Sequence, residues 1–170
     1  MSKGVLSGAQ EHPPVLLTSQ QSDALRVDFR PSTEVVAIHR GDHEVRCSDG
    51  SVVRYDKLVL ATGGHPRRLS CPGADLPNVY TLRTIEDSRA IARKLVRGNR
   101  LLIIGGGWIG LEIAATARGK QVDVMVLEAG PRLCARSLPP QLSDFLLDKH
   151  RKEGVDVRLS TTVTSIMVGR

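Results

Sequence analysis

The amino-acid sequence predicts an α/β fold, and three observations lead to that prediction. Short runs rich in β-branched residues lie between residues 26 and 64. After Thr84 the apolar residues take a helical spacing, and strand-like and helical segments then alternate. The stretch "LLIIGGGWIGLE" at 101–112 passes from an apolar strand through glycines into a helix. The order from 100 to 159 is therefore βαβαβ, which is one mononucleotide-binding half of a doubly wound fold.

The bulk composition is that of an ordinary globular protein about one domain long. The 170 residues are 41% hydrophobic and 25% charged, which suffices for a packed core. No apolar run approaches the roughly 20 residues that a membrane helix needs. The first residues contain no apolar centre of the kind found in secretory signals. We therefore expect a cytoplasmic protein that does not associate with a membrane.

The net charge of +6 raises the question of an anionic partner. The arginines are scattered along the chain, and an aromatic content of 3% leaves little to stack on bases. The charge therefore favours a solvated surface, or a docking face for an acidic protein, over nucleic-acid binding. Cys47, Cys71 and Cys134 lie far apart without metal-ligand spacing, so we expect buried or unreactive thiols and no metal site.

The chain before residue 80 has the composition of short strands joined by turns. Asp49-Gly50 is turn chemistry between two β-rich runs, which predicts a hairpin. The run "KLVLATGG" is continuously apolar, so we expect a strand buried on both faces. Three prolines and a glycine then predict a loop. The expected strands are 26–29, 34–38, 43–47, 51–55 and 57–64, and the expected loop is 65–79.

The second half carries clear helix start and stop signals. Thr84 and Asp87 resemble a capping box, and Gly98 is expected to close the helix that follows. Two prolines suit the first turn of a later helix, which Gly154 is expected to end. The expected elements are helix 85–97, strand 100–104, helix 108–118, strand 122–127, helix 139–154, strand 155–159 and strand 162–168.

The glycine motif G-x-G-x-x-G predicts a dinucleotide site because a buried strand precedes it and a helix follows it. Gly105 would allow the tight turn, Gly107 the approach of the pyrophosphate, and Gly110 close packing of helix on strand. Amides at the helix start would hold the phosphate charge. Glu128 follows Gly105 by 23 residues, a spacing that suits a carboxylate on the ribose hydroxyls and favours NADH over NADPH.

Two alternatives to this interpretation remain open at the level of sequence. The glycine turn could serve only to pack a helix on a strand, without a ligand. Arg132 lies close enough to Glu128 in sequence to weaken the preference for NADH, or it is simply solvated.

Several stretches together resemble the FAD-dependent pyridine-nucleotide oxidoreductases. Within that family the chain looks most similar to the ferredoxin reductase components of bacterial aromatic-ring dioxygenases of the biphenyl and benzene type. The resemblance implies an enzyme in which NADH passes a hydride to FAD, which releases electrons singly to an iron–sulfur ferredoxin. The stretches are "LVLATGGHPRRL" at 58–69, "YTLRTIEDSRAI" at 80–91, "RLLIIGGGWIGLEIAATAR" at 100–118, "VLEAGPRL" at 126–133 and "DFLLDKHRKEGVDVRL" at 144–159.

The resemblance also implies roles for particular residues. Glu112 would lie near the nicotinamide, and Lys3, in "SKGVL", would lie near the flavin N5 and pair with Glu112. A cation there would stabilise reduced flavin; the alternative for Lys3 is a frayed terminal residue. The residues implied to lie against the FAD are Ala61, Thr62 and Gly63, with Arg67 beside them.

Two positions depart from the pattern of the resembled family. Trp108 stands where a smaller or tyrosine-like residue is common, and would either cover the nicotinamide pocket or pack against the helix. Gln121 stands where relatives often have glycine, which puts a local turn in question.

The resemblance divides the chain into a partial FAD-binding domain at 1–97 and a partial NAD-binding domain at 98–170. The family's first G-x-G-x-x-G is not found before Gly105, and its later Gly-Asp flavin segment is also not found. We therefore expect an internal piece of a longer protein that holds FAD weakly by itself and whose partner is an acidic ferredoxin. The functional alternative is a non-catalytic module or remnant that binds NAD or ADP.

The related disulfide reductases are a further alternative. In those enzymes two redox cysteines lie just before the equivalent Ser-Lys, so the start of this sequence does not separate the two subfamilies. The match over residues 80–133 favours the ferredoxin reductases.

Overall fold

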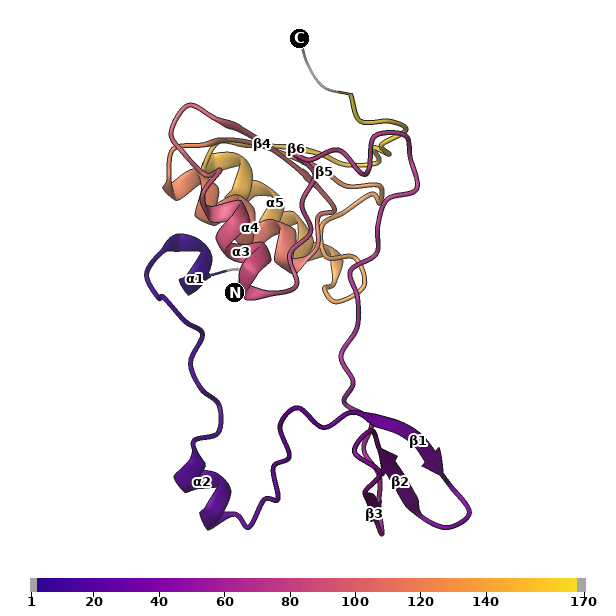
Figure 1. Ribbon diagram of the computed structural model, residues 1–170. Coiled ribbons are helices and arrows are strands. Elements are labelled where there is room, and N and C mark those ends of the chain that lie inside the picture. Colours follow the sequence, from indigo (N-terminus) through magenta and orange to yellow (C-terminus); the bar gives the residue numbers. More distant parts are fainter. Residues whose placement is uncertain (1–2, 168–170) are drawn as a thin grey trace. The chain divides into compact units, whose positions relative to one another are not determined.

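The computed structural model describes residues 3–167 and separates the chain into two compact units (Figure 1). One unit is formed by residues 14–64. The other joins the N-terminal segment up to Pro13 to the chain from His65 onward.

The unit of residues 14–64 contains a three-stranded antiparallel sheet. Its strands β1 (Val35–His39), β2 (Glu44–Cys47) and β3 (Val52–Arg54) pair in the order β1-β2-β3. The predicted hairpin is confirmed, since β2 pairs with β3 across the Asp49-Gly50 turn. Gly50 has φ +86°, which favours glycine.

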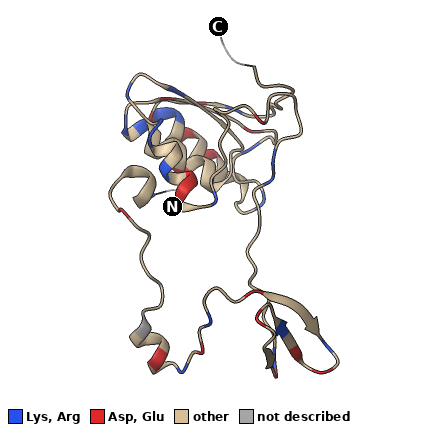
Figure 2. Ribbon diagram, in the orientation of Figure 1, with Lys and Arg blue, Asp and Glu red and all other residues tan. Residues whose placement is uncertain are grey.

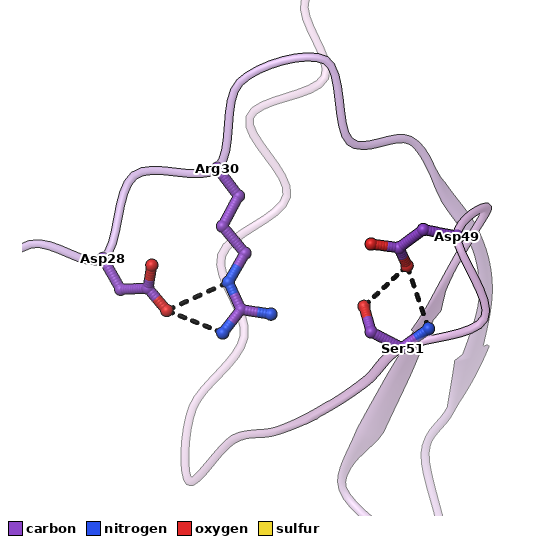
Figure 3. A network of polar contacts seen from close by, with 4 residues as sticks. All are labelled: Asp28, Arg30, Asp49 and Ser51. Carbon is purple, nitrogen blue, oxygen red and sulfur yellow. Dashed lines mark hydrogen bonds and ion pairs between the residues drawn. The ribbon is translucent and has the colours of Figure 1, made fainter.

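Two polar contacts lie in the loops beside this sheet (Figure 3). Asp49 accepts hydrogen bonds from the Ser51 hydroxyl at 2.7 Å and the Ser51 backbone N–H at 2.9 Å, which lowers the pKa of Asp49. Arg30 donates two hydrogen bonds to one oxygen of Asp28, at 2.7 and 3.0 Å. This contact lowers the pKa of Asp28 and raises that of Arg30. Both are exposed surface contacts, so we assign them little stabilisation.

The predicted strand at 26–29 is wrong. The short helix α2 (Ser19–Ala24) precedes it, capped by a reciprocal capping box between Thr18 and Gln21. The chain then leaves the helix through Arg26, whose φ is +54°, and the Val27 N–H donates to the Ser22 carbonyl. The backbone that would have paired in a strand therefore terminates a helix. Six residues are too few to show a helical period, which is why the sequence did not reveal α2.

The predicted strand at 57–64, expected to be buried on both faces, is also wrong. Residues 58–64 are irregular, and Val59 and Leu60 are 84% and 67% exposed. A buried strand needs a hydrogen-bonded neighbour on the ladder. Among residues 3–167 no strand pairs with this segment.

The second unit contains a parallel sheet that fulfils the predicted βαβαβ order. Helices α4 and α5 connect its strands, and α3 precedes the first strand. Figure 1 shows these three helices on one side of the sheet. The strands are β4 (Arg100–Ile104), β5 (Asp123–Leu127) and β6 (Val155–Arg158), in the order β4-β5-β6, and the helices are α3 (Ile85–Ala92), α4 (Trp108–Gly119) and α5 (Pro140–Lys152).

The core of this unit lies between the sheet and the helices. Alternate strand residues such as Ile103, Val126 and Val157 are buried there. On the other side, Leu102 and Ile104 remain 50% and 39% exposed. The strand before the glycine turn is therefore covered on one face only, whereas the sequence predicted a buried strand. The apolar run is continuous, but successive side chains point to opposite faces.

The helix boundaries largely follow the predicted signals. The capping box at Thr84 is present, and two backbone N–H groups donate to Asp87, which lowers its pKa. Helix α3 ends at Ala92, earlier than the predicted stop at Gly98, because the helical hydrogen bonds give way to turns at 93–94 and 97–98. Figure 2 shows the acidic start of α3 and the basic end of α5, as the helix dipole favours.

The predicted strand at 162–168 is wrong over its described part. Residues 162–167 are irregular, and Val168 lies outside the described residues. The Ile166 N–H donates to the Pro72 carbonyl at 2.8 Å, so this segment meets the 65–79 loop instead of a sheet edge. A Cβ on Gly73 would lie 2.0 Å from the Ile166 carbonyl oxygen, so this crossing requires glycine.

Candidate functional site

The glycine turn joins β4 to α4 with the geometry that the motif predicts. Gly105 has φ +108°, and its N–H donates to the Leu127 carbonyl, which continues the pairing of β4 with β5. A Cβ on Gly110 would lie 2.3 Å from the Gly105 carbonyl oxygen and 3.2 Å from the Ile103 side chain. The tight turn at Gly105 and the close packing at Gly110 are therefore confirmed.

Among residues 3–167 no acceptor is found for the first backbone N–H groups of α4, which lie beside this turn. Gly107 is the N-cap residue, and the first backbone hydrogen bond of the helix runs from the Leu111 N–H to the Gly107 carbonyl at 3.0 Å. The amides of Trp108, Ile109 and Gly110 thus precede the hydrogen-bond ladder. A Cβ on Gly107 would meet nothing within 4 Å. The helix start can therefore receive an anionic group.

Glu128, at the end of β5, is attached to the glycine turn by its side chain. One carboxylate oxygen accepts the Gly106 N–H at 2.6 Å, and the other accepts the Gly130 N–H at 2.7 Å. Each oxygen has a second lone pair, so the half-buried carboxylate still has acceptor capacity for two hydroxyl groups. Its contact with a ribose remains a prediction.

Arg132 is not a solvated residue, and it does not extend toward Glu128. It donates to the carbonyls of Ala135 at 2.9 Å and Leu138 at 2.5 Å, and to the Ser143 hydroxyl at 3.1 Å. Ser143 is buried and donates to the Leu133 carbonyl at 2.7 Å. The guanidinium therefore organises the loop between β5 and α5.

Trp108 reaches across to the same loop. Its indole N–H donates to the Ser137 hydroxyl at 3.0 Å, and the side chain is half exposed. Of the two interpretations drawn from the sequence, a nicotinamide cover and packing against the helix, neither included this contact.

The structure brings Lys3 and Glu112 together, as the resemblance implied. The Lys3 ammonium lies 3.3 Å from a Glu112 carboxylate oxygen. The segment is anchored by helix α1 (Gly4–Ser7), in which Leu6 is fully buried in the core. Lys3 is therefore not frayed. Its side chain is 77% exposed, so solvent screens the ion pair and we assign the pair little stabilisation. The role of the pair near a flavin remains a prediction.

The residues implied to contact FAD lie in both units. Ala61, Thr62 and Gly63 belong to the unit of residues 14–64, and Arg67 belongs to the other unit, where it is exposed. Ala61 and Thr62 line an apolar groove of about 510 Å³, whose other walls come from β1, Val45 and residues 58–60. Gly63 has φ +72°. Their contact with FAD remains a prediction.

Three residues that shape the turn were not predicted from the sequence. A Cβ on Gly106 would lie 2.5 Å from the Leu133 side chain, and the Cys134 N–H donates to the Gly106 carbonyl at 3.0 Å. The available signal for Gly106 was the run of three glycines, because the motif requires only two glycines at these three positions. The contacts of Leu133 and Cys134 had no signal in the sequence, because they depend on how the loop folds back.

The thiols and the other potential metal ligands give no further site among the described residues. All three cysteines are free, and Cys47 and Cys134 are buried as expected. Burial raises the pKa of Cys134, and the negative charge of Glu128 raises it further. In residues 3–167 no cluster of three or more potential metal ligands is found. No helix in that range has the length and apolar character to cross a membrane.

Comparison with known proteins places these features in a family context. The family model for pyridine nucleotide-disulphide oxidoreductases matches residues 1–169. Putidaredoxin reductase CamA of Pseudomonas putida is 41% identical, over 96% of this chain and 40% of the relative. The biphenyl dioxygenase system ferredoxin–NAD(+) reductase component of Paraburkholderia xenovorans is 40% identical, over 92% of this chain and 38% of the relative.

A solved structure gives the same result. The covalent putidaredoxin reductase–putidaredoxin complex matches with a TM-score of 0.82 and 40% identity, covering 99% of this chain and 41% of that chain. The chain thus spans about 40% of the length of the curated relatives that it matches.

Proposed function

The chain belongs to the pyridine nucleotide-disulphide oxidoreductase family, and from this premise we propose that it binds NADH at the glycine turn. We further propose that it serves an NADH-dependent flavoprotein reductase that delivers electrons to an iron–sulfur ferredoxin of an aromatic-ring dioxygenase system. The observation that supports the proposal most directly is the hydrogen bond from the Gly106 N–H to the Glu128 carboxylate. It lies beside the backbone N–H groups at the start of α4.

The chemistry of this site suits a dinucleotide with free ribose hydroxyls. The amides at the start of α4 would hold the pyrophosphate, and the open space at Gly107 would admit it. Glu128 would accept the ribose hydroxyls, and its negative charge would repel a 2′-phosphate. Arg132 keeps its positive charge, but its terminal N–H groups donate to loop carbonyls and to Ser143, so they would not pair directly with that phosphate.

The residues proposed for electron transfer are Lys3, Glu112 and the segment Ala61–Gly63 with Arg67. Bound FAD would accept a hydride from NADH and release its two electrons singly to ferredoxin. Lys3 would supply positive charge near the reduced ring, and Glu112 would hold the Lys3 ammonium in place. The small side chains of Ala61 to Gly63 would allow the backbone to approach a flat ring closely.

The organisation and location of the protein belong to the same proposal. Residues 1–97 would contribute to the FAD-binding domain and residues 98–170 to the NAD-binding domain. A net charge of +6 supports an acidic ferredoxin as the partner. The proposal places the protein in the cytoplasm, where NADH is available.

A nucleotide-binding module without flavin chemistry is the second candidate. The glycine turn is fully formed, whereas residues 61–63 lie in an exposed irregular segment. This contrast favours NADH binding over FAD binding for the 170-residue chain by itself.

A titration tests both candidates. The purified chain is titrated with NADH and with NADPH in a calorimeter, together with Glu128→Ala and the matched control Glu153→Ala. Glu153 caps the far end of α5, so its removal should leave the affinity unchanged. We expect the wild-type chain to bind NADH more tightly than NADPH. For Glu128→Ala, the dissociation constants of the two nucleotides should differ less than for the wild type.

A turnover assay then separates the two candidates. Reduction of a ferredoxin or dye by NADH with added FAD supports the reductase, and NADH binding without turnover supports the module. No binding of either nucleotide by the wild-type chain would overturn the proposal.

A further inference from the structure

The loop between β5 and α5, residues 129–139 and hereafter the β5–α5 loop, lies against the glycine turn. Its first part is held by buried contacts. The Leu133 side chain packs on Gly106, and the Cys134 N–H donates to the Gly106 carbonyl at 3.0 Å. Both Leu133 and Cys134 are buried. The inner part of the loop is therefore fixed by the core of the unit.

The outer part of the loop has a different kind of support. Residues 135–137 are exposed. Arg132 binds carbonyl groups of the loop itself, so it fixes the shape of the loop without joining it to α4. The contact with α4 comes from Trp108, whose indole N–H donates to the Ser137 hydroxyl at 3.0 Å. Ser137 in turn donates to the Cys134 carbonyl at 3.3 Å.

These hydrogen bonds form a continuous series beside the start of α4. It passes from Gly106 to Cys134, from Cys134 to Ser137, and from Ser137 to Trp108, the first residue of the helix. The same helix start presents the free amides of the candidate nucleotide site. In open α/β sheets a ligand lies outside the carboxyl ends of the strands, where the β5–α5 loop also lies.

We propose that the hydrogen bond between Trp108 and Ser137 is a latch that holds the β5–α5 loop in the conformation that receives the adenosine half of NADH. This inference rests on the proposed function, since it concerns the same site. The ribose hydroxyls of the adenosine would lie at Glu128, so its base would lie next to the residues that follow Glu128. A loop that is already ordered spares the ligand the entropic cost of ordering it. Trp108 and Ser137 are therefore positioning residues.

The hydrogen bond between Trp108 and Ser137 can be removed by a small change in either residue. Trp108→Phe keeps an aromatic ring and removes the N–H, and Ser137→Ala removes only the hydroxyl. Ser137→Thr keeps the hydroxyl and is the conservative control. The dissociation constants of NADH and of ADP-ribose are measured for the wild type, the three variants and the double variant Trp108→Phe/Ser137→Ala.

We expect each of the two disrupting variants to weaken both ligands by about twofold to tenfold, the range of one net hydrogen bond. The double variant should bind no more weakly than the single variants, because both remove the same contact. Ser137→Thr should bind like the wild type. Equal effects on NADH and ADP-ribose are expected because the two ligands share the adenosine half.

Trp108 is the only tryptophan in the sequence, so its emission reports the latch without any ligand. Ser137→Ala should change the emission spectrum of the free protein, because the indole N–H loses its partner, and Ser137→Thr should not change it. This reading is independent of turnover and of nucleotide affinity.

The outcomes separate the latch from the function on which it rests. Wild-type binding that neither variant alters, or a double variant weakened by the product of the single effects, overturns the latch alone. A wild-type chain that binds neither NADH nor ADP-ribose overturns the proposed function, and the role of the latch with it.

Discussion

The carboxylate of Glu128 accepts the backbone N–H of Gly106 at 2.6 Å across 22 residues of sequence. The other oxygen of the same carboxylate accepts the Gly130 N–H at 2.7 Å. One side chain therefore joins the end of β5 to the glycine turn and to the loop that follows.

Removing this carboxylate should destabilise the protein before any ligand is added. Glu128→Ala leaves two amides without their acceptor, so we expect a loss of about 1–3 kcal/mol in the free energy of unfolding. Glu128→Gln keeps one acceptor oxygen and should lose less. Urea unfolding of the three proteins measures the difference, and equal stabilities would show that the amides do not need the side chain.

The two glycines of α4 should respond in opposite ways to alanine. In Gly110→Ala the new Cβ would lie 2.3 Å from the Gly105 carbonyl oxygen, so the turn must shift, at about 1–3 kcal/mol of stability. In Gly119→Ala the new Cβ meets nothing within 4 Å, and helix propensity should add up to about 1 kcal/mol. Thermal unfolding compares the two variants. If both behave alike, the close packing at Gly110 does not constrain the protein.

Gln121 occupies a position whose backbone favours glycine. Its φ is +61°, in the turn between α4 and β5, and a non-glycine residue there costs about 1–2 kcal/mol. Gln121→Gly should therefore raise the free energy of unfolding by about 1 kcal/mol. The neighbouring Lys120→Gly is the control, because Lys120 has φ −94° and should lose stability. Denaturant midpoints of the two variants should move in opposite directions.

His150 makes the stability depend on pH. Burial lowers its pKa from the ordinary value of 6.5, because burial penalises the charged form. The unfolded chain therefore binds a proton more readily, so the stability falls as the pH decreases through 6.5 and levels off below the folded pKa. His150→Gln should show a smaller loss between pH 7 and pH 5 than the wild type. His65→Gln, an exposed control, should follow the wild-type profile.

Local sequence patterns were enough to predict the part of the chain that forms the parallel sheet and its connecting helices. The order of strands and helices from β4 to β6, the capping box at Thr84 and the turn at Gly105 each depend on neighbouring residues. The pairing of Lys3 with Glu112 came from the resemblance to known proteins, and the structure brings the two side chains together.

The structure of segments that need a neighbouring strand was not predicted correctly. The apolar run at 57–64 has the composition of a buried strand, but strand formation requires a neighbouring strand, which residues 3–167 do not supply. The segment at 162–167 likewise contacts Pro72 instead of a sheet.

The sequence by itself determined the glycine turn, the helix that follows it and the acidic residue after β5, because glycine spacing and chain order impose them. Only the tertiary structure decided what the remaining polar groups do. Arg132 lies four residues from Glu128, yet its guanidinium binds the carbonyls of Ala135 and Leu138. Trp108 and Ser137 are far apart in sequence and are joined only when the β5–α5 loop folds back on α4. A side chain's partner is set by which segments packing brings within hydrogen-bond distance, and sequence spacing alone does not contain that information.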